Sequence, residues 1–187
     1  MNQLWQMWSG QIHPDFIKQV ITVGQNGVPA TAGLGFDGST NNQGFRSSDI
    51  RWINCDNNKN IADLLWSYAK IANKNAFGFD VNYLNDIQFT TYKAIDKGKY
   101  DWHHDTFWGN PSMSDRKLSL VMQLTDPSEY EGGDFQFDQQ YQQPIREDLR
   151  KKGTVIVFPS FIQHCVTPVT KGTRQSLVAW FEGPKFR

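Results

Sequence analysis

The segment TTYKAIDKGKYDWHHD, residues 90–105, places two histidines and an aspartate at the end of a run that otherwise has the composition of β-strands. Threonine, tyrosine and isoleucine favour extended structure, whereas aspartate and glycine favour the turn between two strands. Side chains alternate between the faces of a strand, so His103 and Asp105 share one face, with Cα atoms roughly 6.5 to 7 Å apart, and His104 points away. A ring nitrogen and a carboxylate oxygen on one face can hold one metal ion.

Short runs of this kind continue to the end of the chain, separated by glycine, proline, asparagine and aspartate, which is typical of a β-domain. We predict strands over 86–95, 100–105, 118–125, 134–138, 154–159 and 174–182, and a weaker strand over 50–53. The first half instead shows two apolar stripes with helical spacing, one after Pro14 and one from Ile61 to Ala72, which ends near Gly78. Helices followed by antiparallel strands predict an α+β fold, with the helices bracing one face of a sandwich or barrel.

The composition excludes several classes of protein. The 187 residues fit one domain, and the 19 basic residues equal the 19 acidic ones, so the chain builds no field that would attract nucleic acid. No apolar run is long enough to span a bilayer, and the first residues, MNQLWQMWSGQ, lack the basic and apolar regions of a signal peptide. We therefore expect a cytoplasmic protein with no nucleic-acid or membrane partner. Cys55 and Cys165 are expected to be ordinary thiols.

A metal site needs a third ligand, and the chain has four histidines. His13 sits at a predicted helix start, where it is expected to be a cap or surface residue. His164 follows an apolar strand that ends at Pro159, and alone it would be read as a half-exposed residue at the rim of a sheet. Together with His103 and Asp105 it gives two histidines and one carboxylate. This set suits non-haem Fe(II), because it leaves positions open for substrates and O₂.

Arg174 lies ten residues after His164. If the chain forms a hairpin that turns around residues 168–172, an even-numbered register places Arg174 on the same face as His164. Its planar guanidinium could then bind a carboxylate through two parallel hydrogen bonds beside the metal. Gly132 and Gly133 are expected to serve a tight turn rather than chemistry.

Several ordered motifs resemble the Fe(II)- and 2-oxoglutarate-dependent dioxygenases, specifically the prolyl-4-hydroxylase-like branch that includes the PKHD-type hydroxylases. The motifs are TTYKAIDKGKYDWHHD, LTDPSEYEGGDFQF and FPSFIQHCVTPVTKGTR, and the resemblance covers roughly residues 86–182. It implies a double-stranded β-helix, or jelly-roll, core over about 86–182. Helices over about 1–80 would support this core within a single domain of residues 1–187.

The resemblance also implies roles for particular residues. His103, Asp105 and His164 would bind Fe(II). Arg174 would bind the distal carboxylate of 2-oxoglutarate, the cosubstrate. Tyr92 matches a strand tyrosine that contacts the same carboxylate, although a core tyrosine fits its position equally well. Gln123 falls where relatives place a further contact to the cosubstrate. Ascorbate is an additional candidate cofactor, and no catalytic residue is implied beyond the metal ligands.

Relatives of this branch hydroxylate prolyl residues in peptides or proteins, which implies a peptide or protein substrate together with O₂. The segments FDGSTNNQGFRSS (36–48) and TFWGNPSMSDRK (106–117) have the composition of loops and could cover the site. Arg46, in the first segment, would hydrogen-bond carbonyl groups of a peptide substrate or remain a solvated surface residue. Four aromatic residues could wall the pocket or belong to the core: Trp102, Phe107, Trp108 and Trp180.

Two alternatives remain open on the sequence alone. The same chemistry could act on a small molecule or a nucleobase, as in the alkylation-repair dioxygenases, which carry a second arginine where this chain has Trp180. The chain could instead be a non-catalytic metal-binding jelly-roll module. Such a module would have no use for Arg174 as a carboxylate clamp.

Overall fold

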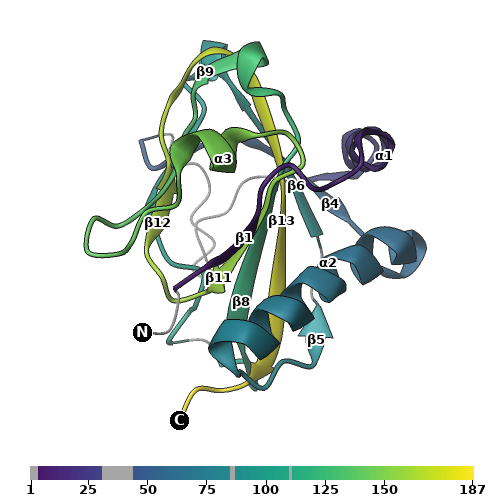
Figure 1. Ribbon diagram of the computed structural model, residues 1–187, viewed down its shortest axis with the longest axis vertical. Coiled ribbons are helices and arrows are strands. Elements are labelled where there is room, and N and C mark those ends of the chain that lie inside the picture. The colour runs from purple at the N-terminus through teal and green to yellow at the C-terminus, as the bar shows by residue number, and fades with distance from the viewer. Residues whose placement is uncertain (1–3, 31–43, 85–86, 110) are drawn as a thin grey trace.

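The computed structural model describes residues 4–30, 44–84, 87–109 and 111–187, and this part of the chain is mostly antiparallel sheet with few helices (Figure 1). The strands of a large sheet are β1 (Gln6–Trp8), β2 (Val28–Ala30), β4 (Asp49–Ile53), β5 (Tyr83–Leu84), β6 (Ile87–Lys93), β8 (Ser114–Gln123), β9 (Tyr130–Gly132), β11 (Val155–Pro159) and β13 (Val169–Pro184). Their order is β1-β11-β8-β13-β6-β4-β2, and β5 and β9 also pair with β13.

A smaller sheet has the strands β3 (Arg46–Ser47), β7 (Lys99–His103), β10 (Phe135–Phe137) and β12 (His164–Val166), in the order β10-β12-β7-β3. The helices are α1 (Pro14–Gln25), α2 (Lys59–Ala72), a π-helical turn (Asn73–Phe77) and α3 (Arg146–Arg150). Short 3₁₀ turns occur at Asp56–Asn58, Ala94–Asp96 and Pro127–Glu129.

The large sheet separates two apolar cores because its side chains alternate between faces. On β8, Leu118, Leu120 and Met122 are fully buried on the face that α1 and α2 cover, whereas Ser119 and Val121 point toward the smaller sheet. Figure 1 shows the same arrangement, with α1 and α2 on one side of β8 and β13 and with β12 on the other. The second core lies between the two sheets, and the candidate site is built beside it.

Both predicted helices are present, with α1 beginning at Pro14 and His13 as its N-cap. The second apolar stripe forms α2 and ends in the π-helical turn at Gly78, whose φ of 68° is left-handed. Every predicted strand overlaps an observed one, including the weak one, which lies within β4. The region 1–80 also contributes β1, β2, β3 and β4 to the two sheets, so it supplies more than helical support.

The predicted hairpin between the segments that carry His164 and Arg174 is wrong. β12 pairs with β10 and β7 in the smaller sheet, whereas β13 pairs with β8 and β6 in the large one. The first residues of β13 pair with β9, and Pro168, between the two segments, has no backbone N–H to offer a hairpin ladder. The chain therefore crosses from one sheet to the other.

The two predicted loops are described only in part. Residues 36–43 lie outside the described residues, whereas Arg46 and Ser47 form β3. The last four residues of the segment 106–117 belong to β8. In the part of the chain that the structure describes, no helix has the length and apolar character needed to cross a membrane.

Candidate metal centre

The smaller sheet brings the two histidines together. β12 pairs with β7 in antiparallel register, and His164 lies directly opposite His103. Asp105 lies just beyond the end of β7, where its backbone N–H donates to the carbonyl of Ser160 at 2.7 Å. Nε2 of His103 is 3.9 Å from Oδ1 of Asp105, and Nε2 of His164 is 3.6 Å from Oδ2. Candidate ligand atoms of the three residues all lie within 4.8 Å of one another, while His104 is exposed, as the alternation predicted.

Both imidazole rings are fixed by hydrogen bonds on the side away from this cluster. Nδ1 of His103 is 2.7 Å from the carbonyl of Asp101, and Nδ1 of His164 is 2.8 Å from the carbonyl of Ile162. A carbonyl can only accept, so each Nδ1 carries the proton. A lone pair on Nε2 of either ring would then be directed at the cluster, which is the arrangement that metal-binding histidines use.

A chain of hydroxyl groups holds the carboxylate of Asp105. The Ser119 hydroxyl donates to Oδ2 of Asp105 at 2.6 Å, and the Ser160 hydroxyl lies 2.9 Å from that of Ser119. Ser119 has a single hydroxyl proton, so Ser160 donates to Ser119 and Ser119 donates to the carboxylate. Oδ1 of Asp105 receives no hydrogen bond from a hydroxyl group in the described part of the chain.

The protonation states of the cluster suit a cation. Burial lowers the pKa of His103 to about 3, and the neighbouring His164 adds to this lowering. Burial alone raises the pKa of Asp105, but His164, His103 and Arg116 outweigh it and bring the pKa to about 2. His103 is uncharged at neutral pH because its pKa is low. Among the residues that lower the pKa of Asp105, Arg116 is therefore the one that always carries a positive charge. A neutral imidazole and an ionised carboxylate are the forms that bind metals.

Arg174 and Tyr92 lie beside this cluster from the large sheet. They are directly opposite each other on β13 and β6, and each side chain is 3% exposed. Both residues line one pocket together with His103, Asp105 and His164. Nη1 of Arg174 is buried and has no hydrogen-bond partner among the described residues. A buried guanidinium nitrogen without a partner is rare, and it indicates a place where a ligand completes the hydrogen bonding.

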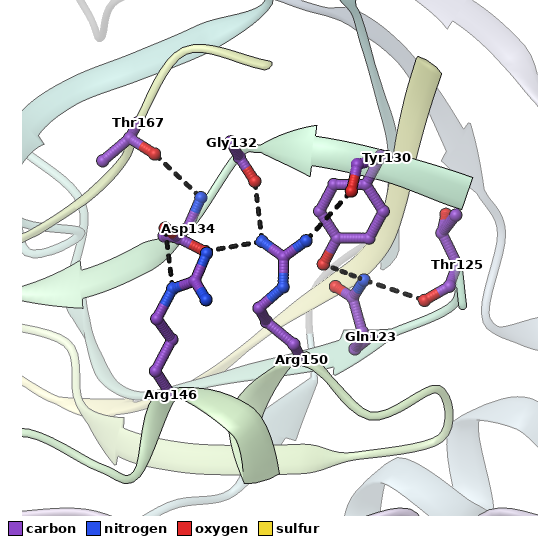
Figure 2. A network of polar contacts seen from close by, with 8 residues as sticks. All are labelled: Gln123, Thr125, Tyr130, Gly132, Asp134, Arg146, Arg150 and Thr167. Carbon is purple, nitrogen blue, oxygen red and sulfur yellow. Dashed lines mark hydrogen bonds and ion pairs between the residues drawn. The ribbon is translucent and has the colours of Figure 1, made fainter. Parts of the chain in front are cut away.

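Gln123 lies outside this pocket. Its amide Nε2 donates to the carbonyl of Thr125 at 3.1 Å and to the hydroxyl of Tyr130 at 2.9 Å (Figure 2). Arg150 lies over the ring of Tyr130, with Cζ 4.2 Å from the ring centroid, and it donates to the carbonyls of Tyr130 and Gly132. The structure therefore brings Tyr92 and Arg174 to the candidate metal ligands, whereas Gln123 lines a neighbouring cavity together with Arg174.

The same network reaches Arg174 through the turn at Gly132 and Gly133. Arg150 and Arg146 bind opposite oxygens of Asp134, which fixes the chain directly after this turn (Figure 2). A Cβ atom added at Gly133 would lie 3.1 Å from Cδ of Arg174, and φ at Gly133 is +62°. The glycine is thus needed both for the turn and for the close approach of the backbone to the arginine stem.

Of the four aromatic residues considered, Trp180 alone lines the pocket in the described part of the chain. Its Nε1 is buried and has no partner among the described residues. Trp102 and Trp108 are 37% and 60% exposed. The cavity measures about 30 Å³, room for roughly two water molecules, so a larger ligand must displace lining side chains.

Sequence reasoning missed the residues that support the cluster. Ser119 occupies an alternate position in the apolar run LSLVMQL, and a polar residue at such a position is a usable signal. Ser160 and Tyr100 gave no comparable signal, although the Tyr100 ring stacks on His103 with centroids 3.5 Å apart. One of the two expectations for Arg46 was a solvated surface residue. Arg46 is instead 6% exposed, and its guanidinium lies over the ring of Tyr100.

Comparison with known proteins identifies the family. The sequence profile of the 2OG-Fe(II) oxygenase superfamily matches residues 87–182, which is more than half of the chain. The chain belongs to the 2OG-Fe(II) oxygenase superfamily. The matched segment contains His103, Asp105, His164 and Arg174.

The chain also resembles curated members of this superfamily. It is 36% identical over 96 residues to a PKHD-type hydroxylase of Synechococcus sp. strain CC9311, an alignment that covers 51% of this chain and 41% of that protein. It is 40% identical over 65 residues to a PKHD-type hydroxylase of Klebsiella pneumoniae strain 342, covering 35% of this chain and 28% of that protein. The matched segment thus spans less than half the length of these relatives.

Solved structures share the fold over nearly the whole chain. A viral collagen prolyl hydroxylase from Paramecium Bursaria Chlorella virus-1 has a TM-score of 0.72 at 18% identity, covering 97% of each chain. A Pseudomonas putida prolyl-4-hydroxylase has a TM-score of 0.70 at 19% identity, covering 98% of this chain and 94% of that one. A prolyl hydroxylase from Trichoplax adhaerens, solved with a hypoxia inducible factor peptide fragment, has a TM-score of 0.72 at 17% identity, covering 96% and 83%.

Proposed function

We propose that this protein is an Fe(II)- and 2-oxoglutarate-dependent hydroxylase that uses O₂ and acts on a peptidyl side chain such as proline. The observation that carries the proposal is the convergence of His103, Asp105 and His164 beside the unpartnered guanidinium of Arg174 in one buried pocket. The antiparallel sheets would be the two halves of a double-stranded β-helix. Residues 1–187 would form a single domain around it.

The donor set fits an iron ion. Within the described residues, no fourth histidine, cysteine or carboxylate joins the three candidate ligands. A structural zinc site is closed by four protein ligands, whereas a site with two histidines and one carboxylate leaves positions open. His103 and His164 would each bind through Nε2, and Asp105 would bind through the oxygen that Ser119 does not hold.

The hydrogen-bonding groups that line the pocket also suit a dicarboxylate cosubstrate, which would displace lining side chains as it binds. The fork of a guanidinium matches a carboxylate in two parallel hydrogen bonds, and Nη1 of Arg174 has no other partner among the described residues. Tyr92, directly opposite on β6, would complete the clamp. Burial raises the pKa of Tyr92, so its hydroxyl stays protonated and able to donate.

When bound, iron and 2-oxoglutarate together would supply the oxidising chemistry that inserts one oxygen atom of O₂ into a C–H bond, with succinate and CO₂ as coproducts. The protein holds the groups in place and excludes water from the reacting atoms. The hydrogen bond that Ser119 donates to Asp105, and those that two backbone carbonyls accept from Nδ1 of His103 and of His164, orient the ligand atoms. Trp180, Tyr100 and Phe135 wall the pocket with apolar surface.

The peptide substrate is supported by the relatives. The sequence relatives are PKHD-type hydroxylases, and the Trichoplax enzyme with the same fold was solved with a peptide fragment. The balanced charge of this chain favours a peptide over a nucleic acid.

Mass spectrometry of proline-containing peptides tests the proposal. The peptides would be incubated with the protein, Fe(II), 2-oxoglutarate and O₂. We expect addition of one oxygen at proline in the wild type and no addition with His103→Ala. Modification of a free amino acid or a nucleobase, with no peptide modified, would contradict the proposed substrate class.

A further inference from the structure

Arg46 lies close to the candidate metal centre although it belongs to a short edge strand. It sits on β3 opposite Tyr100 on β7, and its Cζ atom is 4.3 Å from the centroid of the Tyr100 ring. That ring stacks on His103 with centroids 3.5 Å apart. These two distances together limit the separation between the guanidinium carbon and the His103 ring to about 8 Å.

The guanidinium of Arg46 is buried and has no counter-ion among the described residues. The residue is 6% exposed, its Nε donates to the Ser48 hydroxyl at 2.9 Å, and its Nη2 has no hydrogen-bond partner among the described residues. No carboxylate in the described part of the chain lies within 4.0 Å of it. Burying a cation without a partner is costly. Such a group therefore indicates a ligand that supplies the missing negative charge.

The proposed iron site and cosubstrate leave this charge unmatched. Asp105 is the sole carboxylate that lines the metal pocket in the described residues, and it is committed to the metal and to Ser119. One carboxylate of 2-oxoglutarate would bind Arg174 and the other would lie at the metal. The remaining ligand, the substrate, is then the source of an anion for Arg46.

An open groove leads from solvent to Arg46. It measures about 610 Å³, and its charged lining residues are Arg46, Lys93, Lys97, Lys99, Asp49 and Asp96. Asp49 pairs with Lys93 and Asp101 pairs with Lys99, whereas Lys97 and Arg46 form no ion pair among the described residues. The groove therefore carries an excess of positive charge, which attracts an anionic chain toward the site.

We propose that Arg46 binds a carboxylate of the substrate, so that the preferred substrate is a peptide with an acidic residue close to the residue that is hydroxylated. If the modified residue lies beside the His103 ring, the separation of about 8 Å between that ring and the Arg46 guanidinium corresponds to roughly two positions of an extended chain, which advances about 3.3 to 3.6 Å per residue. This inference rests on the proposed function, and it adds a chemical class of peptide to it.

Binding measurements on the full chain test the inference. Isothermal titration without O₂ would use Mn(II)-loaded protein with 2-oxoglutarate and two sets of end-blocked hexapeptides. Each set carries proline with glutamate or glutamine one or two positions before or after it. In the wild type we expect a glutamyl peptide to bind about 10-fold tighter than its glutaminyl counterpart, since hydrogen bonds to charged partners are the strong ones.

Variants separate the role of Arg46 from general charge. Arg46→Met keeps an apolar side chain over Tyr100. It should bring the ratio of the dissociation constants of the glutaminyl and glutamyl peptides close to one, whereas Arg46→Lys should keep part of the preference for the glutamyl peptide. Lys59→Gln removes an exposed cation of α2 and should leave the preference unchanged. Thermal unfolding of each variant checks that the fold is retained.

The outcomes distinguish this inference from the proposed function. If the wild type binds Mn(II) and 2-oxoglutarate but binds both peptides of every pair equally, or binds none, the anion subsite is wrong and the proposed iron site stands. If Arg46→Met weakens 2-oxoglutarate binding in the absence of peptide as strongly as it weakens peptide binding, Arg46 belongs to the cosubstrate site instead. If the wild type binds neither Mn(II) nor 2-oxoglutarate, both the proposed function and the inference fail.

Discussion

Replacement of Ser119 by alanine removes the hydrogen bond that orients the carboxylate of the candidate metal centre. The Ser119 hydroxyl donates to Asp105 at 2.6 Å, and the two residues are 0% and 6% exposed, so water does not take its place. A hydrogen bond to a charged group contributes about 1.5 to 3 kcal/mol, and loss of a partner that orients a metal ligand lowers affinity about 10- to 100-fold. We therefore expect Ser119→Ala to weaken metal binding by about that factor.

Isothermal titration with Mn(II) or with Fe(II) in the absence of O₂ measures this loss. Ser176→Ala provides a matched control, because Ser176, on the neighbouring strand β13, is 2% exposed and lines the same pocket but is not hydrogen-bonded to any of the three candidate ligands in the described residues. Ser160→Ala should have an intermediate effect, since Ser160 acts on the carboxylate through Ser119. Metal affinity of Ser119→Ala within twofold of the wild type would refute the reasoning.

Three further changes have definite expected outcomes. Arg174→Lys keeps the charge but loses the planar fork, so calorimetry should show about 10-fold weaker 2-oxoglutarate binding with metal affinity retained. Unchanged 2-oxoglutarate binding would show that Arg174 does not bind the carboxylate of the cosubstrate. Arg150→Ala should lower the free energy of unfolding in urea by about 2 to 3 kcal/mol, because it removes the less exposed of the two arginines that bind the Asp134 carboxylate and leaves two backbone carbonyls without their donor (Figure 2). The Arg146 side chain is 56% exposed, so Arg146→Ala should cost about 0.5 kcal/mol, and equal losses would contradict this difference. Burial raises the pKa of the Cys165 thiol to about 11. The rate of its alkylation in the native protein should therefore be low at pH 8 and should increase as the pH approaches 11. Rapid alkylation at pH 8 would contradict the raised pKa and the burial of this thiol.

The relative placement of residues 103–105 could be predicted from the sequence because it depends on local alternation along one strand. The alternation of side chains along a strand correctly separated His103 and Asp105 from the exposed His104. The apolar stripes after Pro14 and from Ile61 both formed helices, since their spacing matches the helical repeat.

The remaining features depend on contacts between distant segments. The hairpin that was expected to join His164 to Arg174 does not form, yet both residues reach the pocket because the two sheets face each other. The strands β3, β5, β9 and β12 have two or three residues each, too few to show a periodic pattern. The burial of Arg46 follows from the pairing of β3 with β7, which nothing in the local composition indicates.

Succinate formation from 2-oxoglutarate tests the proposed chemistry most directly, because it requires the metal, the cosubstrate and O₂ but no knowledge of the substrate. We predict that the wild type forms succinate only when Fe(II) and O₂ are both present, that His103→Ala and Asp105→Ala abolish it, and that His104→Ala, at the exposed neighbouring position, retains it. Succinate formation that survives His103→Ala, or that is lost equally with His104→Ala, would contradict the assignment of this cluster as the iron site.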